Sequence, residues 1–263
     1  MAYTEFLSFA RDGYVGIVRL ARPKQLNTIS APFYEAMIEL QQTEIVKNKD
    51  LRAIAILADG RHFSAGIDLN YAKTVIGAPG RSLYGVSYWQ NAYRFWQDCN
   101  LPVVVGIQGA CMGTAMELIA ACDIRIVADN AKFSLREVDV GLSTDLGGTT
   151  RLTKLIGPGM TKFLAMTCED IGAEEAYRIH LAEKIVPLAE LEEVTLGYAR
   201  KLAAKPPIAV QMCKKCINIA AESSYSVGLL AEEIQGIYTA STKDKKEASA
   251  AMVEKRQGNY TYE

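Results

Sequence analysis

The chain has 263 residues, of which 49% are hydrophobic, and this length is sufficient for a large buried core in one domain, with or without a small appendage. Its formal net charge of −1 provides no basic surface of the kind that binds nucleic acid, so we expect no nucleic-acid partner. No run of 18 apolar residues occurs, which argues against a membrane-spanning helix.

The cysteines and histidines favour neither a disulfide framework nor a metal site. No signal peptide or Arg-rich leader precedes the six scattered cysteines, so we expect a reducing compartment and a cytoplasmic location. Cys213 and Cys216 have redox or zinc spacing, but they lie within a helical pattern and no second pair completes a metal site. We therefore expect two helical thiols and no bound metal.

The first part of the chain alternates between strand and helix patterns. Residues 3–23 are typical of two strands joined at Asp12-Gly13, and residues 30–45 have a helical apolar period with Ser30 as a candidate N-cap. Further strands are expected at residues 51–60, 101–109, 122–128 and 131–135. Strands that alternate with helices of this length form βα crossover units, so the pattern predicts an α/β fold with a largely parallel sheet covered on both faces.

After Leu152 the sequence predicts helices and no further strands. The helices are expected at residues 155–167, 172–180, 188–205, 206–221, 225–241 and 244–256. His180 falls where one of them should end in a left-handed conformation, which histidine tolerates better than most residues.

Three acids lie in apolar or glycine-rich surroundings. Glu117 sits inside an apolar run, where an uncompensated carboxylate is costly, so it is a candidate for a raised pKa. Glu137 ends a strand-like segment, and Asp145 follows eight residues later, just before a pair of glycines. Carboxyls with different proton affinities suit a reaction that removes a proton at one carbon and returns one at another.

Two glycine turns can expose backbone N–H groups to the same ligand. One lies within residues 62–69, directly after an apolar strand, and the other within residues 109–113. Two such donors aimed at one oxygen atom stabilise an oxyanion, and the loss of one typically costs on the order of 3 kcal/mol of barrier. The alternative is two ordinary turns with no shared target.

Together these stretches resemble the crotonase family, also called the enoyl-CoA hydratase/isomerase family. The resemblance spans roughly residues 5–258 and is carried by SAGIDL at 64–69, GACMGTAMELIAACDIRI at 109–126 and EVDVGLSTDLGGTTRL at 137–152. Within the family, the last stretch is most similar to the dienoyl-CoA isomerases. The resemblance implies a spiral core of ββα turns in residues 1–200, and a C-terminal helical region in residues 201–263 that assembles homotrimers or pairs of trimers.

The resemblance also implies roles for five residues. The amides of Ala65 and Thr114 would form the oxyanion hole for an acyl-CoA thioester, although the family mostly has glycine where this chain has Thr114. Glu117 matches the first acid of the hydratases, where the dienoyl-CoA isomerases typically have aspartate. Glu137 matches the second acid of both groups, and Asp145 matches the third acid of the isomerases. Coenzyme A would arrive as part of the substrate, and no other cofactor is expected.

We expect Glu137 and Asp145 to shuttle the proton, while Glu117 orients them, positions a water or tunes their pKa values. If Glu117 and Glu137 instead hold a water together, the enzyme is a hydratase. Two structural alternatives remain: Asp145 as the N-cap of the helix that follows, and Glu117 in a buried ion pair with an arginine.

The family pattern also places substrate-binding residues on this chain. Those expected to contact coenzyme A or the thioester are Lys24, Ser64, Gly66, Ile67, Asp68 and Gly113. Tyr84, Tyr88 and Trp89 fall in the region that lines the acyl pocket and would favour a flat or cyclic acyl group, with packing in the core as the alternative.

The sequence therefore predicts an enzyme that converts a 3,5-dienoyl-CoA to the 2,4-dienoyl-CoA. The alternative within the family is an enoyl-CoA hydratase, or a related ring hydratase or hydrolase. A non-catalytic acyl-CoA-binding or RNA-binding paralogue is a further alternative, but three retained acids argue against an inactive binder and the net charge argues against RNA.

Overall fold

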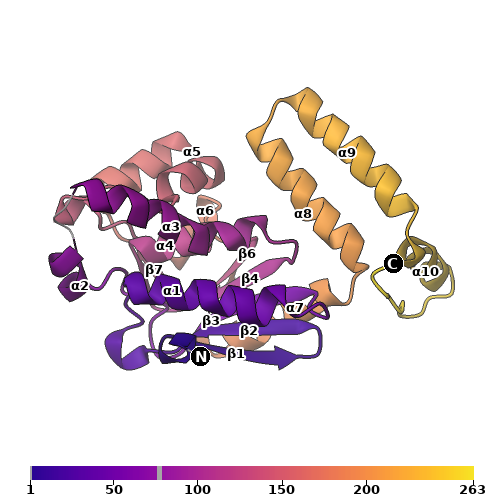
Figure 1. Ribbon diagram of the computed structural model, residues 1–263, viewed down its shortest axis with the longest axis horizontal. Coiled ribbons are helices and arrows are strands. Elements are labelled where there is room, and N and C mark those ends of the chain that lie inside the picture. Colours follow the sequence, from indigo (N-terminus) through magenta and orange to yellow (C-terminus); the bar gives the residue numbers. More distant parts are fainter. Residues whose placement is uncertain (1, 76–78) are drawn as a thin grey trace.

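The computed structural model describes residues 2–75 and 79–263, with the backbone alone at residues 2, 74, 75 and 79–84 (Figure 1). Its main sheet has six strands in the order β1-β2-β3-β4-β6-β9. These strands are β1 (Leu7–Asp12), β2 (Val15–Leu20), β3 (Ala53–Ala58), β4 (Val103–Ile107), β6 (Ile124–Ala128) and β9 (Lys184–Val186). β1 and β2 form the predicted antiparallel hairpin, and the other neighbouring strands of this sheet are parallel, which confirms the predicted α/β fold with a largely parallel sheet.

Helices cover both faces of this sheet, so its central strands are apolar along their whole length. On one face lie α1 (Ala31–Leu40), α3 (Pro79–Asp98) and α4 (Thr114–Ala120), which share the larger apolar core with alternate residues of the strands. On the other face α7 (Leu191–Ala203) packs against β3, β4 and β6. Ser30 occupies the N-cap position of α1 as predicted, but its side chain forms no capping hydrogen bond.

A second sheet of three short strands stands beside the first. It contains β5 (Ala110–Met112), β7 (Lys132–Ser134) and β8 (Ile171–Gly172). The prediction that no strand follows Leu152 is wrong, because β8 and β9 both do. These strands have only two and three residues, which is too short for an alternating pattern to register, and tertiary pairing with β7 and β6 forms them.

The remaining helices that precede α7 in the chain are α2 (Leu69–Val75), α5 (Gly148–Thr167) and α6 (Ala173–Arg178). α5 starts earlier than predicted and bends at Gly157, which has non-helical dihedral angles and precedes Pro158. α6 ends as predicted, with His180 at a φ of 65° and the amide of Leu181 bonded to the carbonyl of Ala176 at 2.8 Å.

The chain leaves the sheet after α7. α8 (Pro207–Glu222) and α9 (Tyr225–Ala240) form an antiparallel pair that projects from the rest of the molecule, and α10 (Lys243–Val253) follows the lower end of α9, opposite the turn that joins the pair (Figure 1). The expected division at residue 200 falls within α7 and stays a prediction. No helix in the described part of the chain combines the length and apolar character needed to cross a membrane.

Candidate active site

A cavity of about 1130 Å³ lies where the loops after β3 and β5 meet α1, α3 and the segment 136–146. Most of the residues singled out from the sequence line it. They are Ala65, Gly66, Ile67, Asp68, Trp89, Gly113, Thr114, Glu117, Glu137 and Asp145.

The two glycine turns lie side by side at this cavity. Ser64 and Cys111 form an isolated parallel bridge, with the amide of Met112 bonded to the carbonyl of Ser64 at 3.1 Å. Gly66 has a φ of +85°, and a Cβ there would lie 2.7 Å from the carbonyl oxygen of Met112. This position therefore requires glycine, both for its backbone conformation and for the close approach of the second turn.

The two candidate oxyanion donors, the amides of Thr114 and Ala65, differ in their hydrogen bonding. Thr114 is the first residue of α4, so its amide is one of those that a helix leaves without an intrahelical acceptor. The amide of Ala65 donates to the carbonyl oxygen of Leu26 at 3.0 Å, and Leu26 itself has a left-handed conformation, with a φ of 52°. A ligand oxygen that binds here must share the hydrogen of the Ala65 amide with Leu26 or take it over.

Glu117 is a buried carboxyl held by backbone amides. Its side chain is 1% exposed, and Oε1 accepts hydrogen bonds from the amides of Leu146 and Gly148, both at 2.9 Å. Burial, followed by the negative charge of Glu137, raises the pKa of Glu117 to about 8, although the two amides oppose this. The expected alternative, an ion pair with arginine, is not the arrangement found, because the nearby Arg151 bonds to Gln97 and to the carbonyl of Leu146 instead.

Glu137 presents a free oxygen at the cavity. Its Oε2 is buried and has no hydrogen-bond partner, and a Cβ on Gly113 would lie 2.9 Å from Oε1. Burial raises the pKa of Glu137, and the charge of Asp145 adds to the increase. A buried oxygen without a partner is costly to a fold, so this carboxyl is placed for a ligand or a water. Asp139 is exposed and pairs with Arg136 at 3.1 Å, and both of these side chains also line the cavity.

Asp145 lies at the mouth of the cavity. Its side chain is exposed, and partial desolvation by the surrounding walls raises its pKa. The N-cap of α5 is Gly147, with a φ of 103°, so Asp145 does not cap that helix. The three carboxyls share one cavity, and charge on Glu137 and Asp145 raises the pKa of Glu117.

Aromatic side chains form one wall of the cavity. Trp89 was expected there from the sequence, and Tyr34 was not. Trp89 stacks on Tyr34 with ring centroids 5.4 Å apart and an interplanar angle of 22°, and both line the cavity. Tyr34 had no sequence signal, because its place in an amphipathic helix is that of a core residue. The side chain of Tyr84 lies outside those that the structure describes.

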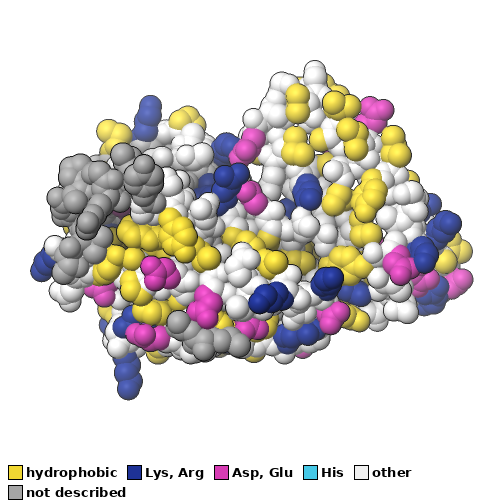
Figure 2. Space-filling view, viewed as in Figure 1, with side chains coloured by type: hydrophobic (Ala, Val, Ile, Leu, Met, Phe, Trp, Pro, Cys, Tyr) yellow, Lys and Arg dark blue, Asp and Glu magenta, His cyan; other side chains and the backbone are white. Residues whose placement is uncertain are grey.

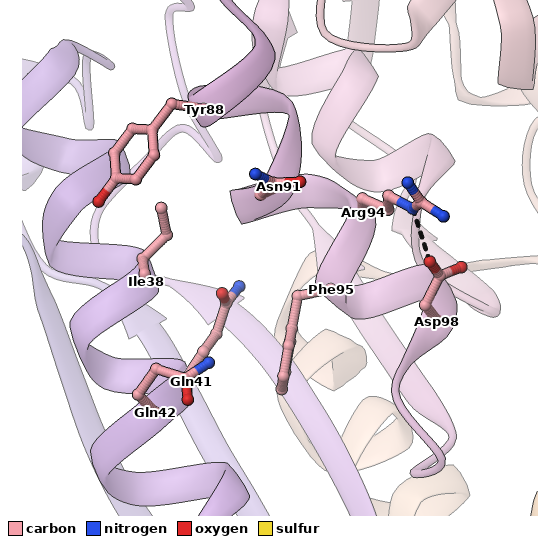
Figure 3. A pocket seen from close by; sticks show the side chains of 8 residues that line it. All are labelled: Ile38, Gln41, Gln42, Tyr88, Asn91, Arg94, Phe95 and Asp98. Atoms are coloured by element: carbon pink, nitrogen blue, oxygen red, sulfur yellow. Dashed lines mark hydrogen bonds and ion pairs between the residues drawn. The ribbon is translucent and has the colours of Figure 1, made fainter. Parts of the chain in front are cut away.

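Tyr88 does not line the cavity that Trp89 lines. It is 47% exposed and lines a separate pocket of about 370 Å³ between α1 and α3, together with Ile38 and Phe95, while Arg94 and Asp98 form an ion pair at 2.7 Å at its end (Figure 3). Successive residues of a helix point about 100° apart, so one of this neighbouring pair faces the cavity and the other does not.

Lys24 and Ser64 do not line the cavity itself. Lys24 is exposed in the short helical turn η2 (Pro23–Gln25), beside Gln25, which does line it. Ser64 is fully buried; its hydroxyl donates to the carbonyl of Asn27 at 2.8 Å and accepts the amide of Gly66 at 3.1 Å. Ser64 therefore shapes the turn. Among the described side chains, no group of three or more His, Cys, Asp or Glu residues is arranged to hold a metal ion.

Comparison with known proteins gives one consistent picture. The sequence model of the enoyl-CoA hydratase/isomerase family matches residues 11–263. The chain is 32% identical over 247 residues to the short-chain-enoyl-CoA hydratase of Clostridium acetobutylicum, which covers 94% of each protein. It is 31% identical over 261 residues to the mitochondrial delta(3,5)-delta(2,4)-dienoyl-CoA isomerase of Dictyostelium discoideum, covering 93% of this chain and 86% of the relative.

The fold agrees with the sequence. A crystal structure of the enoyl-CoA hydratase from Bacillus anthracis superposes with a TM-score of 0.92 at 31% identity, covering 98% of this chain and 100% of that one. The crotonase-like fold expected from the sequence is thereby confirmed. The chain belongs to the enoyl-CoA hydratase/isomerase family and is an enzyme of the hydratase or isomerase type.

Proposed function

We propose that this enzyme shifts the double bonds of a 3,5-dienoyl-CoA to give the 2,4-dienoyl-CoA. The observation that carries the proposal is that Asp145 lines the same cavity as Glu117 and Glu137. Addition of water to an enoyl-CoA needs two carboxyls at one end of the substrate, whereas a shift across a diene needs proton exchange at two distant carbons, for which a third carboxyl at the cavity mouth is suited.

The thioester would bind with its carbonyl oxygen between the amides of Thr114 and Ala65. Charge that develops on this oxygen is stabilised by the two donors, and this acidifies the carbons conjugated with the carbonyl. Since the Ala65 amide already bonds to Leu26, the full hole forms when the ligand oxygen competes for that hydrogen. Lys24 lies near the rim of the site, where it would meet the phosphates of coenzyme A.

In the proposed reaction the carboxylate of one acid removes a proton from C2, and the C2–H electron pair becomes the C2=C3 double bond. The C3=C4 pair becomes the C4=C5 double bond, and the C5=C6 pair forms the new C6–H bond with a proton from a second carboxylic acid. We assign this exchange to Glu137 and Asp145. Glu117, whose pKa of about 8 keeps it mostly protonated near neutrality, would orient the shuttle as a neutral hydrogen-bond donor. No cofactor is required beyond the coenzyme A of the substrate.

A hydratase is the second candidate, and one observation favours it. The charge of Glu137 is the largest contribution to the raised pKa of Glu117 after burial, which indicates that the two carboxyls are near neighbours. Such a pair can hold one water between an acid and a base for addition across a 2-enoyl-CoA.

Two substrates and two variants separate these reactions. The wild type, Asp145→Asn and Glu117→Gln are each incubated with a 3,5-dienoyl-CoA and with a 2-enoyl-CoA, and diene absorbance and water addition are followed separately. The isomerase proposal expects a diene shift that Asp145→Asn reduces by about 10²-fold or more, with no hydration. Hydration that is lost in Glu117→Gln and unaffected in Asp145→Asn would replace it with the hydratase. Asp12→Asn is the matched control, because Asp12 is a partly exposed carboxyl that pairs with Arg200 and does not line the cavity.

We also propose assembly as homotrimers or pairs of trimers through the C-terminal helices. Large apolar side chains lie exposed along α8 and α9, and Figure 2 shows hydrophobic side chains scattered over that projecting part of the molecule. Ile234 and Ile237 are 57% and 68% exposed on α9. In sedimentation equilibrium the wild type should have the mass of three or six chains, and Ile234→Glu with Ile237→Glu should give monomers; a monomeric wild type would contradict the proposal.

A further inference from the structure

Three hydroxyl groups meet beneath the candidate oxyanion donor. Thr114 Oγ1 lies 3.0 Å from the hydroxyl of Tyr34 and 3.1 Å from that of Tyr93. They come from three helices, α1, α3 and α4, which pack on the same face of the sheet. The exposed fractions are 4% for Tyr34, 6% for Thr114 and 0% for Tyr93, so bulk water does not compete for these bonds.

The number of protons in this group limits which hydroxyl can be the donor in each hydrogen bond. Three hydroxyls carry three protons, and the two contacts of Thr114 Oγ1 use two, so the third O–H points either between the two tyrosines, which also interact with each other, or out of the group. Tyr93 is fully buried and does not line the cavity, so a free proton on Tyr93 would have no ligand to meet. The lower-energy arrangement has Tyr93 donating to Thr114, and leaves the spare donor on Tyr34 or Thr114.

Both of these side chains line the cavity, whereas Tyr93 does not. Burial raises the pKa of Tyr34 and of Tyr93 above the usual value, so both keep their protons at any pH at which the enzyme works. The ring of Tyr34 is fixed by stacking on Trp89 and by an edge contact with Tyr93, with centroids 5.5 Å apart. The hydroxyl is therefore held in place before any ligand binds, as a catalytic hydrogen-bond donor must be.

We propose that the hydroxyl chain Tyr93–Thr114–Tyr34 supplies a side-chain donor to the oxygen that the Thr114 amide binds, with Tyr34 giving the proton of the final hydrogen bond. Tyr34 is then a ligand-contacting residue, and Thr114 and Tyr93 are positioning residues that fix the direction of its O–H. The inference rests on the proposed thioester site, and it gives a reason for threonine at the position where a glycine would supply the amide alone.

The test uses four substitutions in the full-length enzyme. Tyr34→Phe should lower kcat about 10–100-fold with little change in KM, because the donor acts on charge that develops during the reaction. Thr114→Val keeps the shape and the backbone amide, and should cause a similar loss, while Thr114→Ser restores the hydroxyl and should recover most of the activity. Tyr93→Phe should have a smaller effect, because Thr114 can still donate to Tyr34.

Tyr3→Phe is the matched control. Tyr3 is also a buried tyrosine with one side-chain hydrogen bond, to Glu44 at 2.8 Å, and it lies outside the cavity. It should leave kcat unchanged, which separates loss of a catalytic donor from loss of a buried hydroxyl.

A spectroscopic measurement tests the hydrogen bond to the thioester oxygen without relying on turnover. The thioester carbonyl stretch of bound 2,4-dienoyl-CoA is recorded by difference Raman spectroscopy. The wild type should shift it to lower frequency, and Tyr34→Phe and Thr114→Val should shift it less. An equal shift in the wild type and Tyr34→Phe, or an unchanged kcat in both Tyr34→Phe and Thr114→Val, would overturn the inference. The absence of any shift in the wild type would instead contradict the proposed thioester site.

Discussion

The sheet-bearing core and the projecting C-terminal helices both bury charged side chains, but they treat them differently. In the core, Glu137 keeps a buried oxygen without a partner, and Glu117 is buried with its pKa raised to about 8. At the base of the C-terminal pair, the ammonium of Lys214 on α8 bonds to Asp123 at 2.8 Å and to the carbonyls of Trp96 and Leu101 at 2.8 and 2.9 Å. At the cavity of the core a buried oxygen of Glu137 has no partner, whereas at the base of the C-terminal helices each proton of the Lys214 ammonium has an acceptor.

Asp244 in α10 is a second buried charge of this region whose oxygens have partners. Its carboxylate is 1% exposed and accepts the amides of Thr261 and Tyr262 at 2.7 and 3.1 Å. The hydroxyl of Tyr262 in turn donates to the carbonyl of Leu51 in the core, at 3.0 Å. The final residues are thus tied back to the main sheet, so buried charge in this region serves to hold the chain in place.

The largest expected effect is the loss of activity in Glu137→Gln. Because this substitution removes the carboxylate that we expect to exchange a proton with substrate, kcat should fall about 10³-fold. Removal of a desolvated charge should leave the free energy of unfolding unchanged or slightly higher. Steady-state kinetics and urea denaturation on the same preparation check both statements. If Glu137→Gln lost stability and kept its turnover, Glu137 would be a structural charge like those of the C-terminal region.

The opposite outcome is expected for Lys214→Met. It leaves the half-buried carboxylate of Asp123 without its cation and two carbonyls without a donor, so the free energy of unfolding should fall by about 3 kcal/mol. Folded enzyme should keep its kcat at low temperature, because Lys214 does not line the cavity. Lys215→Met, one residue along the same helix, is the matched control and should change stability by less than about 0.5 kcal/mol. Equal effects of the two substitutions would show that the buried pair does not hold α8 to the core.

The pH dependence of stability should carry the signature of Glu117. Its pKa is raised in the folded protein to about 8 from an ordinary value of 4.5, so the folded state binds the proton more tightly than the unfolded state. This contribution is fully present below pH 4.5 and is lost as the pH rises through 8. Between pH 6 and 8 it amounts to roughly 2 kcal/mol of lost stability. Glu117→Gln, which imitates the protonated form, should flatten the curve in urea denaturation; an unchanged slope would place the titration elsewhere.

The smallest expected effects come from substituting glycine at one position with positive φ in each region. His180 after α6 and Lys255 after α10 each adopt a positive φ, 65° and 54°, where glycine is unstrained. His180→Gly should raise the free energy of unfolding by roughly 0.5–1 kcal/mol. Lys255→Gly should give the same gain only if the C-terminal region unfolds together with the core. Thermal melts of both variants, followed by hydrogen exchange of α10, show whether the two regions form one cooperative unit.

The sequence alone determined the mixed α/β core, the hairpin at Asp12-Gly13 and the end of α6 at His180, because each depends on local periodicity or on one residue's backbone preference. It also singled out Glu117, Glu137 and Asp145, since acids in apolar or glycine-rich segments are conspicuous in any sequence. That these three share a cavity followed from the family pattern, whereas the residues themselves already indicated that the two glycine turns could face one ligand.

Only the tertiary structure decided the rest. The strands β8 and β9 exist because β7 and β6 supply their hydrogen bonds, which no local pattern records. Tyr34 reaches the cavity and Tyr88 does not, because the packing of α1 against α3 selects which face of each helix meets the site. The bond from Ala65 to Leu26 and the hydroxyl contacts of Thr114 join residues 21 to 80 positions apart, and such pairings are fixed by the fold as a whole.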